Sequence, residues 1–519
     1  MRDRLTRRSL LAGAAAAAPM FVLPPGVTAA SRRRVEPVRE AEFDCGVMAG
    51  IPGMHAITLW THLEGLERPG YVRLEVAEDE GFSRVVHRSL VRAAPVRDFT
   101  ARRTIRSSRV LRPGRRYHYR FSTRTGSSPV GRFTTVRPPD SREPLRIGFF
   151  SCQKWTAGLY PAHRGLAAED DLDMVLCLGD YIYEGGGRND EIGRVDDIGP
   201  DGQAQTLEEY RAKYRLYLSD ENLRAMHASA AFAAIWDDHE AENNYTGDEP
   251  GTMPESRRRV DFLTRRRNGY LAFFEYGPRN RIPAEPMRSY RRIRLGGMAD
   301  VLMLDTRQYR DPRACETEFQ ACPGIDDPSR TMLGGPQREW IKRVLSGSGA
   351  TWKVIANQVM MMGLDGVPGY PVNPDQWDGY PGDRAEVLGH VRREEIEGVT
   401  VITGDIHTFM AGDVYPDGRF DGARPPATEF IGGSISSNGL EASFPRESLP
   451  AGEAYVRAAN APHLKYINLP RRGYGVLELR PDELLATFRS PTSVTSPDAP
   501  VEDLARFRVG LREGMVERA

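Results

Sequence analysis

The chain has 519 residues, a length that favours two or more domains and allows a large hydrophobic core. Lys plus Arg and Asp plus Glu number 71 each, so the formal net charge is zero. A neutral chain has no overall field to attract nucleic acid or an anionic membrane, and this argues against a nucleic-acid-binding module.

The first 30 residues have the layout of an export signal. The arginine pair Arg7 and Arg8 precedes the apolar stretch LLAGAAAAAPMFVL, and small residues follow at 28–30. The pair resembles a twin-arginine signal, which exports folded proteins. The apolar stretch falls short of the roughly 20 residues that a membrane span needs. We therefore predict a twin-arginine signal at 1–30, a linker at 31–42, no transmembrane segment, and secretion to the periplasm, cell wall or medium.

Two regions of different pattern follow. Residues 43–136 contain short alternating strands and turns without helices, which predicts an accessory β-sandwich of immunoglobulin or fibronectin type. Residues 144–519 alternate strands with helices, which predicts an α/β domain. Helices are expected at 206–230, 259–276, 335–346 and, as an amphipathic C-terminal helix, 500–519; strands are expected at 298–306 and 474–490.

The five cysteines have different predicted roles. Cys315 and Cys322 lie seven apart in a turn-rich segment, which favours a local disulfide in an oxidising compartment. Cys177 lies within an apolar run and is predicted to be a small buried hydrophobe. Cys152 ends an apolar run and begins a polar loop, where a metal ligand or a nucleophile would lie.

Five short apolar runs end in residues that bind metals. They are IGFFSCQ at 147–153, DMVLCLGDYIY at 173–183, FAAIWDDHE at 232–240, WKVIANQ at 352–358 and VTVITGDIH at 399–407. Each predicts a buried strand that opens into a loop, and ligands in α/β folds gather at the carboxyl ends of the strands. The residues delivered there are Cys152, Asp180, Tyr183, Asp238, His239, Asn357, Asp405 and His407. Together they predict a metal centre.

The residue types favour two metal ions. A carboxylate such as Asp180 can bridge two ions, and the phenolate of Tyr183 suits ferric iron. Asp405 and His407 are two residues apart, so in an extended segment they share a face. Taken alone, the Asp237–Asp238 pair would also fit a helix N-cap, and Asn357 would fit an ordinary strand-end cap. A two-metal centre is the interpretation that explains all five strand ends.

A longer series of motifs resembles the PhoD family of secreted alkaline phosphatases and phosphodiesterases. In chain order, the motifs are SCQ, LGDYIYEGG, WDDHEAENNY, LDTRQYR, WKVIANQVMMM, WDGYP, GDIHTFMAGDV and GGSISSNG, and the resemblance as a whole runs from about 45 to 510. The resemblance implies an N-terminal β-sandwich, a calcineurin-like metallophosphoesterase domain with a four-layer αββα sandwich, and a centre of calcium and ferric iron. One departure is MAGIPG at 48–53, where family members commonly have a Gly-Asp-Pro turn.

The resemblance also implies which residue holds which ion. Cys152, Asp180, Tyr183 and His407 would hold Fe3+; Asp180 would bridge to Ca2+, which Asp238, Asn357 and Asp405 would complete. Thiolate, phenolate and imidazole suit iron, whereas an all-oxygen set suits calcium. Asp237, Asn243, Asn244, Asp378 and Tyr380 lie in matching motifs without an assigned role.

The expected function is hydrolysis of phosphate mono- or diesters by a monomer. Metal-bound hydroxide would attack phosphorus in line, and His239 would assist the leaving oxygen as hydrogen-bond donor or general acid. Two alternatives stay open. One is a phospholipase D-like phosphodiesterase acting on phospholipid or on a wall polymer such as teichoic acid. The other is a catalytically dead, calcium-binding wall protein, which the complete set of expected ligands argues against.

Overall fold

The computed structural model describes residues 35–519, apart from 170, 316–321 and 368. The predicted signal at 1–30 and the start of the predicted linker at 31–42 lie outside the described residues. Within the described ranges, no helix is long and apolar enough to cross a membrane.

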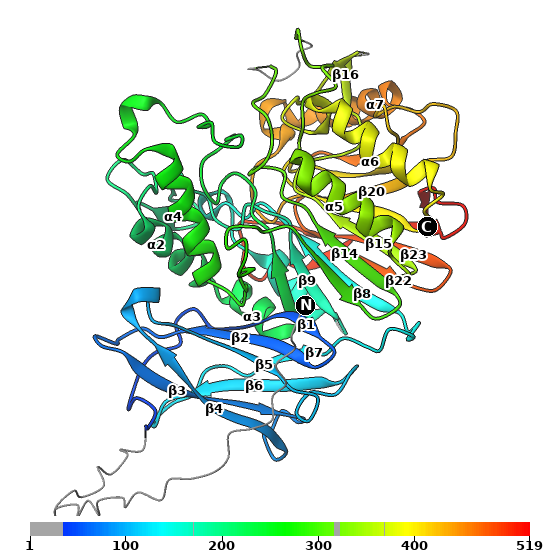
Figure 1. The fold of residues 1–519 in the computed structure, drawn as a ribbon. Coiled ribbons are helices and arrows are strands. Elements are labelled where there is room, and N and C mark those ends of the chain that lie inside the picture. The colour runs from blue at the N-terminus through cyan, green and yellow to red at the C-terminus, as the bar shows by residue number, and fades with distance from the viewer. Residues whose placement is uncertain (1–34, 170, 316–321, 368) are drawn as a thin grey trace, which may run out of the picture. The chain divides into compact units, whose positions relative to one another are not determined.

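Strands from the beginning, the middle and the end of the described chain form one ten-stranded sheet (Figure 1). In spatial order its strands are β25 (Glu517–Arg518), β24 (Val501–Gly510), β23 (Glu483–Pro491), β22 (Tyr474–Leu479), β8 (Leu145–Phe150), β9 (Met174–Cys177), β12 (Ala231–Ala234), β1 (Val47–Gly53), β2 (Ala56–His62) and β5 (Thr100–Arg106). β8, β9 and β12 are parallel neighbours, so their carboxyl ends lie at one edge.

A seven-stranded sheet carries the later strands. Its spatial order is β13 (Arg291–Leu295), β14 (Ala299–Met303), β15 (Trp352–Ala356), β18 (Val399–Thr403), β20 (Ala427–Gly432), β19 (Phe409–Val414) and β21 (Leu464–Asn468). The run from β14 to β20 is parallel. Two short hairpins, β10 (Gly187–Asn189) with β11 (Arg194–Asp196) and β16 (Asp365–Val367) with β17 (Tyr370–Pro371), lie outside these sheets.

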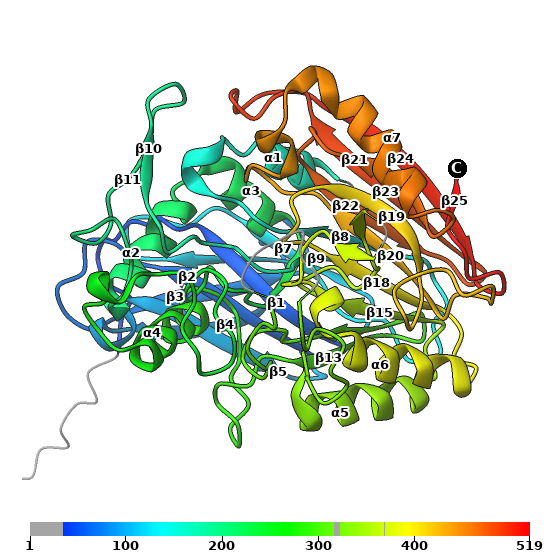
Figure 2. The same cartoon turned by 90° about the horizontal axis from the view of Figure 1, so that it is seen from above.

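Seven α-helices occur among the described residues, and they cover the outer faces of the sheets. They are α1 (Pro161–Ala168), α2 (Leu207–Leu218), α3 (Glu221–Ser229), α4 (Phe262–Glu275), α5 (Gly334–Ser346), α6 (Pro381–Arg393) and α7 (Leu449–Ala459). Figures 1 and 2 show α5 and α6 side by side along the seven-stranded sheet. The helical pattern predicted at 206–230 is two helices, because the Asp220 side chain caps the first turn of α3 at the Leu223 N–H.

The central strands are apolar on both faces because each face is covered. Leu176 of β9 and Val354 of β15 belong to one core that the two large sheets share. The alternate residue Cys177 packs among α1–α4, and Ile355 packs among α5–α7. Cys177 is therefore the buried hydrophobe that its sequence context predicts.

The strands at 47–134 do not stand apart from the central sheet. β1, β2 and β5 extend the ten-stranded sheet, and β1 pairs in parallel with β12, with Ala49 opposite Ala231 and Gly50 opposite Phe232. The remaining strands, β3 (Gly70–Ala77), β4 (Val85–Ala93), β6 (Arg116–Ser122) and β7 (Gly131–Thr134), form a separate four-stranded sheet. Leu59 of β2 and Leu74 of β3 share a core, so these two groups of strands pack together.

The C-terminal helix predicted at 500–519 is wrong. Residues 501–510 form β24, which pairs antiparallel with β23. Ala505, Phe507 and Val509 are buried, whereas Arg506 and Arg508 between them are exposed. This alternation has the period of a strand, and the charged residues give it the superficial composition of an amphipathic helix. The predicted Cys315–Cys322 disulfide is confirmed.

Replacing Phe507 with alanine tests the importance of the C-terminal strand. Phe507 is buried and its ring centroid lies 5.3 Å from that of Phe488. We expect Phe507→Ala to lower the free energy of unfolding by about 3–5 kcal/mol, measured by urea denaturation. Arg506→Ala on the exposed face of the same strand is the control, with a change within about 0.5 kcal/mol. Equal effects of the two substitutions would contradict the placement of β24.

Candidate metal centre

The predicted strand ends bring their side chains to one cluster. The ligand atoms of Cys152, Asp180 and His407 all lie within 4.8 Å of one another. The same holds for Asp180, Asp238 and His239, and for Asp237, Asp238 and Asp405. Asp180 and Asp238 each belong to two of these groups, so the three groups form one cluster. It joins both large sheets, because Asp405 and His407 follow β18 whereas the others follow β8, β9 and β12.

Four residues of the cluster have an unusual backbone conformation. The φ angles of Cys152, Asp180, Asp405 and His407 are 59°, 54°, 59° and 55°. Side-chain-bearing residues rarely adopt this left-handed region, and such strain concentrates at functional sites, where the surrounding structure imposes it. The chain turns sharply after each strand, and the turn holds the side chain over the edge of the sheet.

His407 has a defined tautomer. Its Nδ1 lies 2.6 Å from the backbone oxygen of Asn438, which can only accept, so Nδ1 carries the proton and Nε2 carries a lone pair. Burial lowers the pKa of His407 to about 4, so the ring is neutral. The Tyr183 hydroxyl lies 3.3 Å from Nε2 and 2.7 Å from the Ser437 hydroxyl. Tyr183 and His407 therefore present oxygen and nitrogen to the same point.

Asn357 lies at the end of β15, beside β18. Its side-chain N–H donates to the backbone oxygen of Val359, which leaves Oδ1 as the acceptor, 3.4 Å from Trp377 Nε1. Gln376, which directly precedes Trp377 in the sequence, donates to Asp405 Oδ2. These contacts connect Asn357 to the cluster, although the bond to Val359 is also what an ordinary strand-end cap would make.

Arg307 is a central residue that the predicted ligand set omits. It is fully buried, with Nε 2.5 Å from Asp237 Oδ1 and Nη2 3.4 Å from both Asp238 Oδ2 and Asp405 Oδ1. Nη1 lies 2.8 Å from Asp375. Arg307 belongs to the motif LDTRQYR directly after β14. It is therefore another polar residue that follows a buried strand, and its position is the sequence signal that indicates it.

Glu240 connects two of the ligand-bearing loops. Its carboxylate accepts the backbone N–H groups of Asp180 at 3.2 Å, Tyr181 at 2.6 Å and Asp237 at 2.8 Å. Burial raises the pKa of Glu240 to about 7, although these backbone donors lower it. The loops after β9 and β12 are thus held together by one side chain.

His239 forms a pair with Glu184. Its Nδ1 lies 2.7 Å from Glu184 Oε2, while Glu184 Oε1 accepts the backbone N–H of Asn243 at 2.8 Å. Burial opposes a charge on the imidazole, but the carboxylates of Glu184, Asp180 and Asp238 raise the pKa of His239 well above its usual value. Because Nδ1 is committed to Glu184, Nε2 is the nitrogen that can act on a substrate.

The five residues that lie in the family motifs without an assigned role divide into two groups. Asp237 is part of the cluster, and the backbone N–H of Asn244 donates to Asp238 Oδ2 at 2.7 Å. Asp378 instead pairs with Arg384, and Tyr380 donates to the backbone oxygen of Asp311. Asn243 supports Glu184. Asp378 and Tyr380 therefore contribute to packing near α6 and are not brought to the cluster by these contacts.

The donor atoms fit metal ions. Among the described residues, Asp180 Oδ1, Asp237 Oδ2 and Asp238 Oδ1 are buried oxygens with no hydrogen-bond partner. Burial raises the pKa of Asp180, of Asp237 and of the Cys152 thiol, because an uncompensated buried anion is unfavourable. A cation would satisfy these oxygens and hold the groups ionised. One side of the cluster offers sulfur, nitrogen and phenolic oxygen, and the other offers carboxylate oxygen.

A cavity of about 310 Å³ leads to the cluster, within the size range of small-molecule sites. Tyr183, Glu184 and His239 line it, and so do Lys154 and Arg257. The Lys154 ammonium lies 6.0 Å from the Tyr183 ring centroid. The cavity therefore offers positive charge beside the proposed metal ligands, which suits an anionic substrate.

Comparison with known proteins identifies the family. The model of the PhoD-like phosphatase family matches residues 147–488, and that of the PhoD-like phosphatase N-terminal domain matches 28–137. This chain belongs to the PhoD-like phosphatase family. Alkaline phosphatase D of Bacillus subtilis (strain 168) is 33% identical over 497 residues, which cover 91% of this chain and 82% of that protein. The prediction of a phosphoric ester hydrolase of the PhoD type is thereby confirmed.

Solved structures agree with this PhoD-like phosphatase assignment. The structure of PhoD matches with a TM-score of 0.81 and 31% identity, covering 93% of this chain and 92% of that one. Purple acid phosphatase PPD1 from yellow lupin seeds matches with a TM-score of 0.55 and 12% identity, covering 92% of this chain and 75% of that one. The second match shows a shared fold. The predicted metallophosphoesterase-like α/β architecture is therefore confirmed.

Replacing Glu240 tests how the PhoD-like centre is held together. A glutamine cannot accept three backbone N–H groups with the strength of a carboxylate, and its own NH2 would face those donors. We expect Glu240→Gln to lower the free energy of unfolding by about 1–3 kcal/mol in urea denaturation and to reduce bound metal in elemental analysis. Glu394→Gln, at the exposed end of α6, is the control and should change neither. Normal metal content in Glu240→Gln would contradict this role.

Proposed function

We propose that this chain is an exported, metal-dependent phosphoesterase that hydrolyses phosphate monoesters, diesters or both beside Tyr183 and His239. The observation that carries the proposal is the cluster of three overlapping groups of ligand atoms, each group within 4.8 Å internally, which both sheets supply and which retains unpartnered carboxylate oxygens. Isolated buried carboxylates are costly, so such a cluster is stable when it holds cations.

Two different ions suit the two sides of the cluster. Cys152, Asp180, Tyr183 and His407 would hold Fe3+, because thiolate, phenolate and imidazole favour a transition metal. Asp180, Asp238, Asn357 and Asp405 would hold Ca2+ through oxygen alone. When bound, such ions lower the pKa of water and neutralise charge on a phosphoryl group.

The protein residues would orient the substrate and supply a proton. Protonated His239 would donate from Nε2 to the leaving oxygen, while Glu184 holds Nδ1 and thereby fixes the ring. Lys154 would neutralise non-bridging phosphate oxygens from the wall of the cavity. Arg307 would act as a positioning residue, because it holds Asp237, Asp238 and Asp405 together without facing this cavity.

The proposed location and architecture follow the sequence-based predictions. The Cys315–Cys322 disulfide supports an oxidising, extracytoplasmic compartment reached through the twin-arginine route. We propose a monomer with an immunoglobulin-like β-sandwich at 43–136 and a four-layer αββα domain from 144. The two outer helical layers and the shared core of the large sheets support the latter.

Metal removal tests the proposed function. We expect the protein purified without chelators to contain iron and calcium in elemental analysis and to hydrolyse p-nitrophenyl phosphate or bis-p-nitrophenyl phosphate. Chelation should abolish hydrolysis and added Ca2+ should restore it, because the oxygen ligands of the calcium side are hard donors. Metal-free protein that turns over neither ester in the presence of calcium and iron would contradict the enzyme and leave a binding protein on a phosphatase fold.

Lys154 gives a second, sharper test of the cavity. We expect Lys154→Ala to raise KM for p-nitrophenyl phosphate about tenfold, the effect of losing roughly 1.4 kcal/mol of a charge-assisted contact, with kcat changed less. Initial rates over a range of substrate concentrations measure both constants. Lys342→Ala, on α5 away from the cavity, is the control. An unchanged KM in Lys154→Ala would show that the phosphate does not approach through this cavity.

A further inference from the structure

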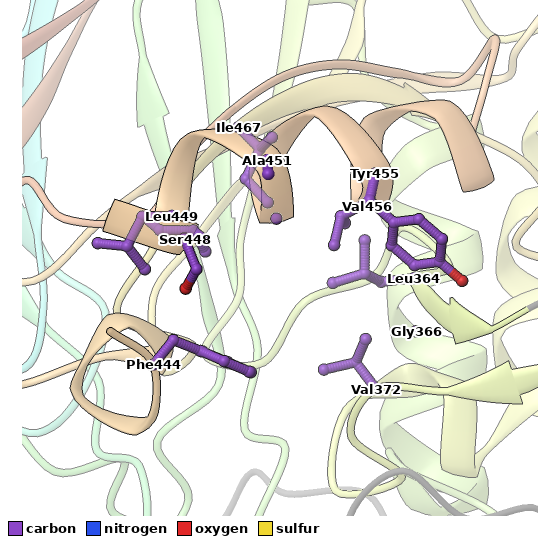
Figure 3. Close-up of a pocket in the computed structure, with 12 residues that line it drawn as sticks. Leu364, Gly366, Val372, Phe444, Ser448, Leu449, Ala451, Tyr455, Val456 and Ile467 are labelled. Carbon is purple, nitrogen blue, oxygen red and sulfur yellow. The ribbon is translucent and has the colours of Figure 1, made fainter. Parts of the chain in front are cut away.

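Two of the cavities outside the metal centre differ in the chemistry of their walls. One, of about 450 Å³, lies between α7 and the segment that carries β16 (Figure 3). Among its lining residues only Ser448 and Tyr455 have a polar group in the side chain, so no charge there selects a ligand. The other, of about 780 Å³, is lined by residues of β4, β5 and α4 and of the segments that follow β4 and α4. Its walls are strongly charged.

Arginine side chains dominate the walls of this second cavity, which we call the arginine cavity. Its arginines are Arg92, Arg97, Arg102 and Arg281, and Glu275 is the one acidic residue among its lining residues. Four positive charges therefore face one negative charge in a space whose volume lies in the range of small-molecule sites. Such an excess of one sign in a concave site attracts a ligand of the opposite sign.

The arginines of the cavity have no internal counter-ion. Within the part of the chain that the structure describes, no carboxylate forms an ion pair with any of the four. The two acidic residues that the chain places beside them are engaged elsewhere. Glu275 Oε2 lies 2.8 Å from Arg211 Nε, and Asp98, next to Arg97 in the sequence, pairs with Arg215. The positive charge of the cavity is therefore not neutralised by the protein itself.

Two of the arginines support the fold and two do not. Arg102 Nη1 donates to the backbone oxygen of Phe274 at 2.9 Å and to a second backbone oxygen. The Arg281 guanidinium lies 5.2 Å from the Phe274 ring centroid. Arg92 and Arg97 are exposed, and their side chains form no hydrogen bond, ion pair or ring contact with any described residue. The fold therefore does not account for Arg92 and Arg97, which are free to bind a ligand.

The charges in the cavity act on one another. Burial and the neighbouring charges of Arg97 and Arg281 lower the pKa of Arg102 to about 10. Burial also lowers the pKa of Arg281, and Arg97 adds to that effect. A like charge nearby disfavours the charged form of each group, and a bound anion would reverse this effect.

We propose that the arginine cavity binds a small polyanion that carries several phosphate or sulfate groups. Guanidinium groups donate paired N–H groups to the oxygens of such anions. Several anionic groups are expected because the four arginines come from separate elements around one cavity. This site is distinct from the metal centre, because the arginine cavity shares no lining residue with the cavity at Lys154 and His239. The proposal thus goes beyond the proposed hydrolysis.

Calorimetric titration of the metal-loaded protein with myo-inositol hexasulfate tests the site. This probe has no phosphoester bond, so a phosphoesterase leaves it intact. We expect one molecule to bind per chain and Arg92→Gln/Arg97→Gln to raise Kd at least about tenfold, because charge-assisted contacts are lost. Neither arginine has a partner in the fold, so this variant should unfold at the wild-type urea concentration. Absence of binding to the wild-type protein would overturn the proposal.

A matched control separates the cavity from general surface charge. Arg103 and Arg106 are exposed on β5 and do not line the cavity. Arg103→Gln/Arg106→Gln removes the same charge, and we expect it to change Kd by no more than about twofold, because exposed charges outside the site are screened by salt. Equal weakening by the two double variants would overturn the assignment of the probe to this cavity.

Inhibition kinetics exclude the metal centre as the binding site. The Ki of the probe against p-nitrophenyl phosphate hydrolysis reports any binding at the centre, and it should be the same in the wild type and in Arg92→Gln/Arg97→Gln. A Ki that rises together with Kd would place the probe at the centre and contradict the proposal. The calorimetric comparison does not require hydrolysis, so it decides the proposal even if the proposed function fails.

Competing anions distinguish the sources of the ligand. Displacement of the probe by inorganic phosphate at lower concentration than by inorganic sulfate indicates phosphate groups, and the reverse order indicates sulfate groups. Either single anion binding as tightly as the hexasulfate would contradict a ligand with several anionic groups. Binding of long heparin chains without binding of the hexasulfate would overturn the proposal in favour of an anionic polymer.

Discussion

Buried negative charge at the ends of the strands is the constraint on which the centre depends. Asp180, Asp237, Asp238 and Asp405 share a small, water-poor space, where two unit charges about 4 Å apart repel by roughly 4 kcal/mol at an effective dielectric of about 20. Arg307 compensates this charge on one side only. The remaining unpartnered oxygens need cations, and Glu240 and the left-handed turns hold the array together against its own repulsion.

The strand ends could be predicted because two simple rules coincide there. Strands that are buried on both faces give continuous apolar runs, and parallel strands place their carboxyl ends at one edge. Cys152, Asp180, Asp238, Asp405 and His407 follow such runs, and the structure brings all of them together. The helices at 262–275 and 334–346 were also predictable, because their apolar residues recur at helical spacing over more than three turns.

Other features depend on contacts that no local pattern reveals. Glu240 acts on the backbone of a distant loop, and Glu184 acts on His239 across 55 residues. The C-terminal segment was predicted to be a helix because arginine and glutamate are good helix formers. Its pairing with β23 makes it a strand instead. β1 likewise joins the central sheet through β12, nearly two hundred residues away, so an apparently separate run of short strands is continuous with the domain that carries the centre.

The most direct test of the central claim is anomalous scattering at the iron absorption edge from a crystal of the mature protein. The account predicts an iron peak bounded by Cys152 Sγ, the Asp180 carboxylate, the Tyr183 hydroxyl and His407 Nε2, next to a lighter ion among the carboxylates. The absence of an iron peak from the cluster, in crystals of protein that binds iron in solution, would contradict it.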